Sequence, residues 1–437
     1  MWKFIPKIKI SASVIEVGDF EIELRLLEGA SKNELASFCR DPKIKAFIKL
    51  PKTDPWLTGL HHELFANELI VKDDDLKDRI TKKWDSNSLG FIFGPPGTGK
   101  TTKSVILSLL ALAQAKENDG QAKVLTLTPT NKAADVFIEK CLDLIHEPDQ
   151  LLELDIGFSQ QENELLISFL KSDFSSEIVY RFGNSKSDKI PSTLVGRSLP
   201  SGNQTLVATT IHRYVFNDPV RVYLNGSEDC DEYLIIDEAS MVPLAYALHA
   251  LLTVNSQTEV GNSKLPKVTI AGDPFQIKPV GMTPHPGETA YKGWTTVSLY
   301  SLLDLKKFNI EKTPIGGYKI DNLKTQYRSN RIIGELYSKY LYNGLLSHYY
   351  DKTPGELDKK FKDEIYYLNF DVHGVDNESN PITKLNKYRK YSIYHIYSCV
   401  LAIELADRIS SVVGDKESIL LLSPYGIQAR ILRDILE

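Results

Sequence analysis

Residues 89–115, LGFIFGPPGTGKTTKSVILSLLALAQA, constrain the fold of this chain more than any other segment. The apolar run at 89–93 predicts a short buried strand, and the pattern after Lys100 predicts an amphipathic helix. Between them lies a G-x-x-x-x-G-K-[ST] phosphate loop, in which glycines let the backbone wrap a phosphate and helix N-terminal N–H groups bind it. The alternative is a glycine-rich turn that binds nothing. The flanking strand and helix favour the phosphate loop.

This loop predicts roles for its side chains. We expect Lys100 to reach the β- and γ-phosphates of a nucleoside triphosphate, and the Thr101 hydroxyl to hold Mg²⁺. The residues expected around the nucleotide are Gly94, Pro95, Gly97, Thr98, Gly99, Lys100, Thr101 and Thr102.

Composition narrows the class of protein. A chain of 437 residues can hold two or three domains, and its formal net charge of −5 provides no overall basic field for nucleic acid, although a local basic groove is sufficient. No apolar run reaches the ~20 residues of a membrane span, and the N-terminus lacks a signal-peptide pattern. We therefore expect no membrane partner and an intracellular location, cytoplasmic or nuclear. The cysteines lack metal-ligand spacing, so we expect buried, reduced thiols at Cys39, Cys141, Cys230 and Cys399.

Strands and helices are expected to alternate from residue 89 onward. This rhythm indicates an α/β fold in which helices cover both faces of a parallel sheet. After the phosphate loop, strands are expected at 124–129, 205–210, 233–238 and 267–273, with a polar, partly helical insertion at about 145–204. Beyond residue 310 a second α/β unit is expected, with helices at 337–346 and 391–410 and strands at 365–370 and 418–424.

The N-terminal residues lie outside this rhythm. Residues 1–30 alternate in polarity and predict a β-hairpin with a turn at Gly18-Asp19, whereas residues 31–88 look mainly helical and polar. We expect residues 1–85 to be an accessory region that could bind a protein partner.

Polar residues follow several of the expected strands. Asp237 and Glu238 end an apolar strand, where the first suits Mg²⁺ binding and the second suits a general base that orients water. Gln276 could contact the γ-phosphate, and Arg328 could stabilise transition-state charge as an arginine finger. Each has a plainer interpretation: a solvated turn for the carboxylates, a turn residue for the glutamine and a surface residue for the arginine.

Six segments in order resemble the superfamily 1 helicases. They are GPPGTGKT (94–101), TPTNKAAD (128–135), IIDEAS (235–240), GDPFQIKPV (272–280), LKTQYRSN (323–330) and SPYGIQ (423–428). The DEAS form and the block at 326–346 resemble the up-frameshift-like 5′→3′ branch. The resemblance covers roughly residues 89–437.

The resemblance implies two RecA-like P-loop NTPase domains, at 86–310 and 311–437, with ATP in the cleft between them. Lys100, Glu238, Gln276 and Arg328 would be catalytic, Thr101 and Asp237 would hold Mg²⁺, and Tyr327 would stack on the base. A single strand of DNA or RNA would contact Pro129, Thr130, Asn131, Thr209, Thr210, His212, Ser423 and Tyr425. Hydroxyl and amide groups suit phosphate contacts that tolerate any base sequence.

The chain departs from the family pattern in three places. No glutamine for reading adenine stands between residues 70 and 93, and Arg389 follows Asn386 where an acidic residue is expected. The chain also ends at Glu437, before the family's two closing motifs. We therefore expect an incomplete second domain. The chain is either a fragment of a longer protein or a shortened version of the family, and the otherwise intact motifs favour a fragment.

The sequence thus predicts an ATP-dependent helicase or translocase that moves on single-stranded nucleic acid. The alternative is a switch or scaffold that binds nucleotide without unwinding. A third possibility is another P-loop enzyme, such as a small-molecule kinase. The segments at 235–240, 272–280 and 323–330 together argue strongly against it.

Overall fold

The fold is taken from a computed structural model. It describes residues 11–17, 22–28, 75–153, 157–172, 178–202, 204–224, 227, 229–254, 265–279, 297–349, 386–388, 392–413 and 419–436. The chain divides into two compact units, Met1–Gly59 and Leu60–Glu437.

The first unit contains the predicted β-hairpin. Strands β1 (Ser11–Val17) and β2 (Ile22–Glu28) pair in antiparallel fashion, and Val17 lies opposite Ile22. The prediction of a hairpin is confirmed, although Gly18 and Asp19 themselves lie outside the described residues. The helices expected between 31 and 88 lie largely outside them too, apart from α3 (Asp75–Lys83).

The second unit is built on an eight-stranded sheet in which every neighbouring pair is parallel. Long apolar runs form its central strands because both faces of a parallel sheet are covered by helices. The spatial order is β10-β3-β9-β8-β4-β7-β5-β6. In chain order the strands are β3 (Leu89–Phe93), β4 (Gln121–Thr128), β5 (Val179–Phe182), β6 (Val195–Gly196), β7 (Gln204–Thr210), β8 (Cys230–Ile236), β9 (Lys267–Gly272) and β10 (Lys319–Asn322).

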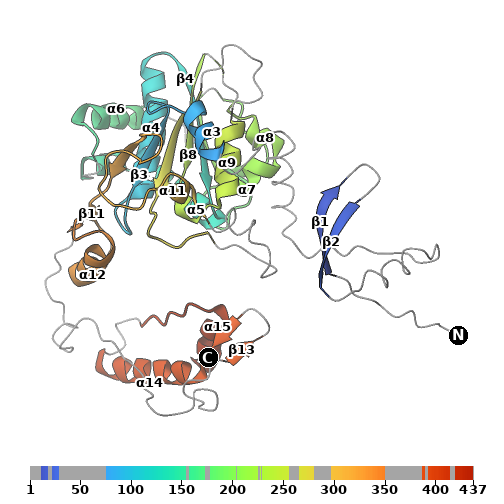
Figure 1. Ribbon diagram of the computed structural model, residues 1–437. Coiled ribbons are helices and arrows are strands. Elements are labelled where there is room, and N and C mark those ends of the chain that lie inside the picture. Colours follow the sequence, from blue (N-terminus) through green and yellow to red (C-terminus); the bar gives the residue numbers. More distant parts are fainter. Residues whose placement is uncertain are drawn as a thin grey trace. The chain divides into compact units, whose positions relative to one another are not determined.

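Two groups of helices pack around this sheet (Figure 1). In one group α4 (Lys100–Glu117) contacts α5 (Asn131–His146) and α6 (Gln160–Lys171). In the other, α9 (Leu244–Thr253) contacts α3, α7 (Ile211–Phe216) and α11 (Leu299–Leu302). No helix in the described part of the chain is long and apolar enough to cross a bilayer.

The apolar faces of α4 and α5 meet the sheet in one continuous core. Leu109 on α4, Phe137 on α5 and Val124 on β4 are each 0% exposed and belong to it. The thiol of Cys141 is also buried there, and burial raises its pKa. Cys230 and Cys399 are likewise buried and free, as predicted, whereas Cys39 lies outside the described residues.

Strand β10 pairs with β3 at one edge of this sheet, with Asn322 opposite Phe93. The domain boundary expected at 310 and 311 would place this strand in the second domain, whereas its hydrogen bonds are made in the first sheet. Asp321 on β10 also forms an ion pair with Lys103 on α4. Because β10 and β3 are parallel neighbours, the segment that follows β10 begins beside the phosphate loop, which follows β3.

The segment expected to be an insertion, 145–204, contributes to the sheet. After α5 it forms the 3₁₀ turn η1 (Pro148–Glu153) and α6, and then β5, which pairs with β7. The turn η3 (Ser192–Leu194) leads into β6, which pairs with β5. The segment is therefore part of the first domain's sheet and not only an addition to it.

The remaining elements follow the first sheet in the chain. They are α8 (Asp218–Arg221), η4 (Ala239–Met241), β11 (Thr325–Gln326), α12 (Arg331–Leu341), β12 (Ser347–His348), β13 (Asn386–Tyr388), β14 (Ser392–Tyr394), α14 (Ile396–Val413) and α15 (Gly426–Leu436). The helices expected at 337–346 and 391–410 are present as α12 and α14, with shifted ends. The strand expected at 418–424 is irregular over 419–424, because an apolar run becomes a strand only when another strand pairs with it. The strand expected at 365–370 and Arg389 lie outside the described residues.

Candidate nucleotide site and strand-facing turns

The carboxyl ends of β3, β9, β8, β4 and β7 meet at one edge of the sheet, because these five strands are neighbours and all parallel. Ligands of open α/β sheets bind at this edge. The segments predicted to bind nucleotide and nucleic acid follow these strands directly, so the fold itself brings them together.

The phosphate loop follows β3 and has the backbone of an anion cradle. Gly97 and Gly99 have φ angles of 76° and 85°, which lie in the left-handed region that favours glycine. At Gly94 a Cβ atom would lie 2.4 Å from Cγ of Lys100 and 2.7 Å from Oγ1 of Thr98. The Thr98 hydroxyl donates to the carbonyl of Pro95 at 2.8 Å, which closes the loop. A side chain at Gly94 would therefore collide with Thr98 and Lys100, so the loop can adopt this conformation only with glycine there.

Lys100 opens α4 and is 7% exposed. Its ammonium group interacts favourably with two buried carboxylates, Asp237 and Asp273. The lysine is therefore held at the strand ends by opposite charges, in the position expected for a phosphate ligand.

Asp237 and Glu238 follow β8. Asp237 is 1% exposed, its backbone N–H donates to the carbonyl of Leu127 at 2.9 Å, and its carboxylate is hydrogen-bonded to Thr101. Burial raises the pKa of Asp237 to about 6, and the neighbouring charge of Glu238 contributes. Glu238 has a φ of 51°, an unusual conformation for a side chain larger than glycine, and such strain clusters at functional sites.

These residues fit a magnesium ion. Oδ1 of Asp237 is buried without a hydrogen-bond partner among the described residues, and the hydroxyl of Thr101 lies beside the same carboxylate. Mg²⁺ takes oxygen ligands and reaches a nucleotide through one or two carboxylates. Thr101 and Asp237 are therefore the residues that would hold it.

Asp273 and Gln276 follow β9. Asp273 is fully buried, accepts from the Tyr342 hydroxyl at 2.6 Å and from the Phe275 N–H at 3.0 Å, and is hydrogen-bonded to the Gln276 side chain. Burial raises the pKa of Asp273, while the hydrogen bond from Tyr342 opposes this shift. Asp273 thereby fixes Gln276 at the same sheet edge as Lys100.

The Gln-Tyr-Arg segment, 326–328, lies against the phosphate loop. The Tyr327 N–H donates to the carbonyl of Gly97 at 2.8 Å, and a Cβ atom on Gly97 would lie 2.6 Å from Cβ of Arg328. Gln326 is fully buried, and its side-chain oxygen accepts from the N–H groups of Arg328 at 3.1 Å and Ser329 at 2.8 Å. The structure thus brings exposed Arg328 to the loop, and the buried glutamine shapes the turn that carries it.

The ring of Tyr327, expected to stack on the base, contacts the ring of Tyr349 with centroids 5.0 Å apart. Tyr327 is half-buried, and its hydrogen bond to Gly97 places this aromatic pair beside the phosphate loop.

The turn after β4 carries the first residues expected to contact nucleic acid. Pro129 is half-buried, whereas Thr130 and Asn131 are exposed. The Thr130 side chain caps α5 by accepting from the Ala133 N–H at 3.1 Å. Thr130 and Asn131 therefore present polar groups at a helix N-terminus.

The turn after β7 divides the expected set. His212 is exposed, and its ring lies 4.5 Å from that of Tyr246. Thr209 is fully buried and donates to the carbonyl of Phe182 at 3.0 Å, and Thr210 is only 7% exposed. The Thr209 hydroxyl therefore faces the protein interior, where a nucleic-acid strand could not contact it.

Ser423 and Tyr425 form a local turn before α15. The Tyr425 N–H donates to the Ser423 hydroxyl oxygen at 3.2 Å, and that hydroxyl donates to the Tyr425 carbonyl at 3.3 Å. Helix α15, which follows this turn, packs on α14. The Gln428 side chain on α15 accepts from the His395 N–H at 3.2 Å.

Four polar residues of the site were missed by sequence reasoning. Asp273 and Gln326 were overlooked inside recognised segments, because roles were assigned to their neighbours Gln276, Tyr327 and Arg328 instead. Lys140 on α5 donates to the Thr102 hydroxyl at 2.9 Å, and Arg181 on β5 donates to Asp135. Neither of these last two contacts has a local sequence signal, because the partners are 38 and 46 residues apart.

Comparison with known proteins agrees with this arrangement. Two families described as AAA domain match residues 78–282 and 305–437, together more than half of the chain. A putative helicase mov-10-B.1 of Danio rerio is 44% identical over 55 residues, which are 13% of this chain and 5% of that protein. This chain therefore spans only a small part of that relative's length.

Two solved structures are similar at low TM-scores. An arterivirus nonstructural protein 10 (helicase) with DNA has a TM-score of 0.26 and 16% identity, over 61% of this chain and 43% of the other. A nuclease-deletion mutant of the Type ISP restriction-modification enzyme LlaGI, with a DNA substrate mimic, has a TM-score of 0.24 and 15% identity, over 56% and 19%. The assignment of the fold rests on the parallel sheet and that of the family on the two AAA domains with their ordered motifs. The chain belongs to the up-frameshift-like branch of the superfamily 1 helicases.

Proposed function

We propose that this chain is the motor part of a nucleic-acid-dependent ATPase, which couples ATP hydrolysis to movement on single-stranded DNA or RNA. The proposal keeps RecA-like domains at 86–310 and 311–437, except that β10 (Lys319–Asn322) pairs in the first sheet and so belongs to the first domain, and it gives 1–85 an accessory role. Lys100 binds the β- and γ-phosphates, Glu238 accepts a proton from the attacking water, and Arg328 stabilises the charge that develops on the γ-phosphate.

One observation carries the proposal. Asp237 keeps a buried oxygen without a hydrogen-bond partner among the described residues, beside Thr101, while Glu238 next to it has a left-handed backbone. A bound Mg²⁺ would supply charge neutralisation at the phosphates. A carboxylate pair with these properties is costly for folding unless it serves a ligand.

The second substrate in this proposal is nucleic acid, which binds at the exposed turns after β4 and β7. Thr130, Asn131 and His212 follow β4 and β7, which lie in the same sheet as the strands of the nucleotide site. Their hydroxyl, amide and imidazole groups suit phosphate contacts that carry no sequence preference. Nucleotide state can then alter the grip on the strand, which is what movement requires.

The test is ATP hydrolysis by the 437-residue chain, with and without single-stranded DNA or RNA. We expect one nucleic acid to stimulate turnover, and both Lys100→Ala and Glu238→Gln to abolish the stimulated rate. Glu238→Gln should still bind nucleotide, because it alters the base and leaves the phosphate ligands intact. The matched control is Glu117→Gln at the exposed far end of α4, roughly 25 Å along the helix from Lys100, which should behave as wild type.

Nucleotide binding without turnover on any nucleic acid would contradict a motor and would favour a nucleotide-dependent switch. Equal stimulation in the Lys100→Ala variant would contradict the assigned site.

A further inference from the structure

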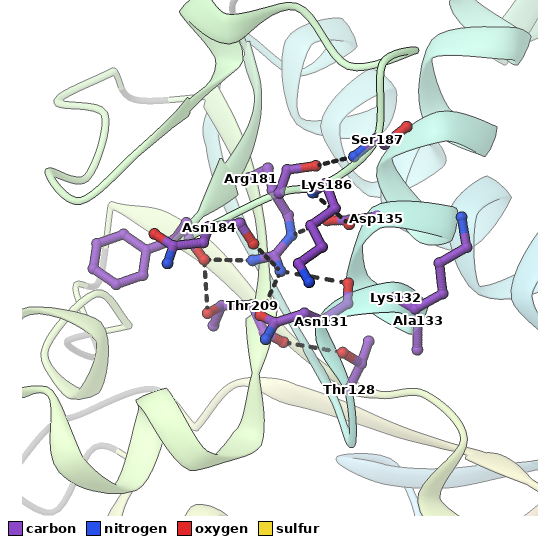
Figure 2. Close-up of polar contacts among 12 residues, drawn as sticks. Thr128, Asn131, Lys132, Ala133, Asp135, Arg181, Asn184, Lys186, Ser187 and Thr209 are labelled. Atoms are coloured by element: carbon purple, nitrogen blue, oxygen red, sulfur yellow. Dashed lines mark hydrogen bonds and ion pairs between the residues drawn. The ribbon is translucent and has the colours of Figure 1, made fainter. Parts of the chain in front are cut away.

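A buried arginine lies beside the turn after β4, which carries Asn131, one of the residues proposed to contact nucleic acid. Arg181 on β5 is 0% exposed, and its Nε donates to Oδ1 of Asp135 on α5 at 2.8 Å (Figure 2). The Asp135 side chain is 3% exposed. Burial lowers the pKa of the guanidinium, and the bond to Asp135 opposes this. Because a buried ion pair adds little stability on its own, the pair needs another explanation.

The other nitrogens of this guanidinium donate to backbone and side-chain oxygens near the same turn. Nη1 donates to the carbonyl of Phe182, and Nη2 donates to the carbonyl of Asn184 at 3.2 Å and to Oδ1 of Asn131 at 2.9 Å (Figure 2). Asp135 completes the cluster by accepting from the Lys186 N–H at 3.3 Å. Arg181 is thus the shared donor that ties β5 and its loop to the first residue of α5.

This contact sets the orientation of an exposed amide. A guanidinium has only donors, so the atom of Asn131 that faces it must be the oxygen. The Nδ2 group, with its two N–H donors, is therefore turned away from Arg181. Asn131 is exposed at the N-terminus of α5, where the helix dipole also favours an anion. The orientation suits a phosphate oxygen, which only accepts.

We propose that Arg181 is a positioning residue for nucleic-acid binding: it holds the Asn131 amide so that Nδ2–H donates to a phosphate oxygen of the strand. This inference rests on the proposed function, because it requires a strand at this turn. It adds a residue to the binding machinery that never touches the strand.

The test is a double-mutant cycle on the affinity of the chain for a single-stranded oligonucleotide at fixed salt. Asn131→Ala should weaken binding about tenfold, since it removes a hydrogen bond to a charged group. Arg181→Lys keeps the charge beside Asp135 but lacks the planar fork that reaches Asn131, and should weaken binding about three- to tenfold. In the Asn131→Ala background, Arg181→Lys should have no further effect. Arg197→Lys, at an exposed arginine that contacts Asn184, is the matched control and should leave binding unchanged.

Additive losses in the cycle, or unchanged binding in Arg181→Lys alone, would overturn the inference. A purely structural arginine would lower the melting temperature and weaken binding equally in both backgrounds. If Arg181→Lys does not fold, Asn131→Asp against Asn131→Ala still decides. With Arg181 in place, the aspartate presents acceptors to the phosphate, so it should bind more weakly than the alanine variant; equal or stronger binding overturns the inference. Wild-type chain that binds no oligonucleotide would instead refute the proposed function.

Discussion

Gly97→Ala should destabilise the contact between the phosphate loop and the Gln-Tyr-Arg segment. A left-handed conformation costs an alanine about 1–2 kcal/mol, and Gly97 has a φ of 76°. The new Cβ would also lie 2.6 Å from Cβ and 3.3 Å from the backbone nitrogen of Arg328, so the segment must move. Losing the Tyr327 to Gly97 hydrogen bond adds about 1 kcal/mol. The total loss should be about 2–3 kcal/mol.

Gly317→Ala is the control that measures the conformational part of this loss alone. Gly317 also has a left-handed φ, 63°, but a Cβ there meets nothing within 4 Å. It should therefore cost only about 1–2 kcal/mol. Thermal melts of the nucleotide-free variants should place the Gly97→Ala midpoint lower by about 2–4 °C for each further kcal/mol. Equal midpoints would refute the reasoning that Arg328 lies on the loop.

Three other predictions follow from buried polar groups. Burial raises the pKa of Asp237 from 3.8 to about 6, so near pH 5 the folded chain keeps a proton that the unfolded chain has lost. Without nucleotide, the free energy of unfolding should therefore fall by about 2 kcal/mol from pH 4 to pH 6, and urea titrations of Asp237→Asn should lack that component. Tyr342→Phe removes a donor from buried Asp273 and should cost about 1.5–3 kcal/mol; an unchanged melting temperature would contradict this. Lys140→Met should weaken ATP binding by up to about tenfold, because the lysine makes the Thr102 hydroxyl an acceptor and so leaves its proton for the nucleotide; an unaltered Kd would contradict this.

The sequence predicted those parts of the site in which residue type and local period coincide. A phosphate loop needs glycines with positive φ between a strand and a helix, and all three features are local, so Gly97, Gly99 and Lys100 were identified directly. Asp237 and Glu238 were proposed for the same reason, since an apolar strand that ends in two carboxylates can be recognised within seven residues.

The contacts that the sequence did not reveal are long-range. KIDN (319–322) has no apolar run, and it becomes β10 only because β3, far earlier in the chain, offers an unpaired edge. Arg181 lay in a polar stretch interpreted as an insertion, and its partner Asp135 is 46 residues away. The sequence also did not reveal that the Thr209 hydroxyl is buried against the Phe182 carbonyl, because residue type does not say which face of a turn a hydroxyl takes.

Helix α5 joins the two proposed sites, with Asn131 at the proposed nucleic-acid contact and Lys140 further along at Thr102. Nine residues of α-helix fix these two contacts about 13.5 Å apart along the axis and set their angular phase. A single inserted residue between them would rotate one contact by about 100° relative to the other, so α5 cannot change length in this interval without uncoupling them. Insertions after His146, where the helix has ended, leave this phase unaltered.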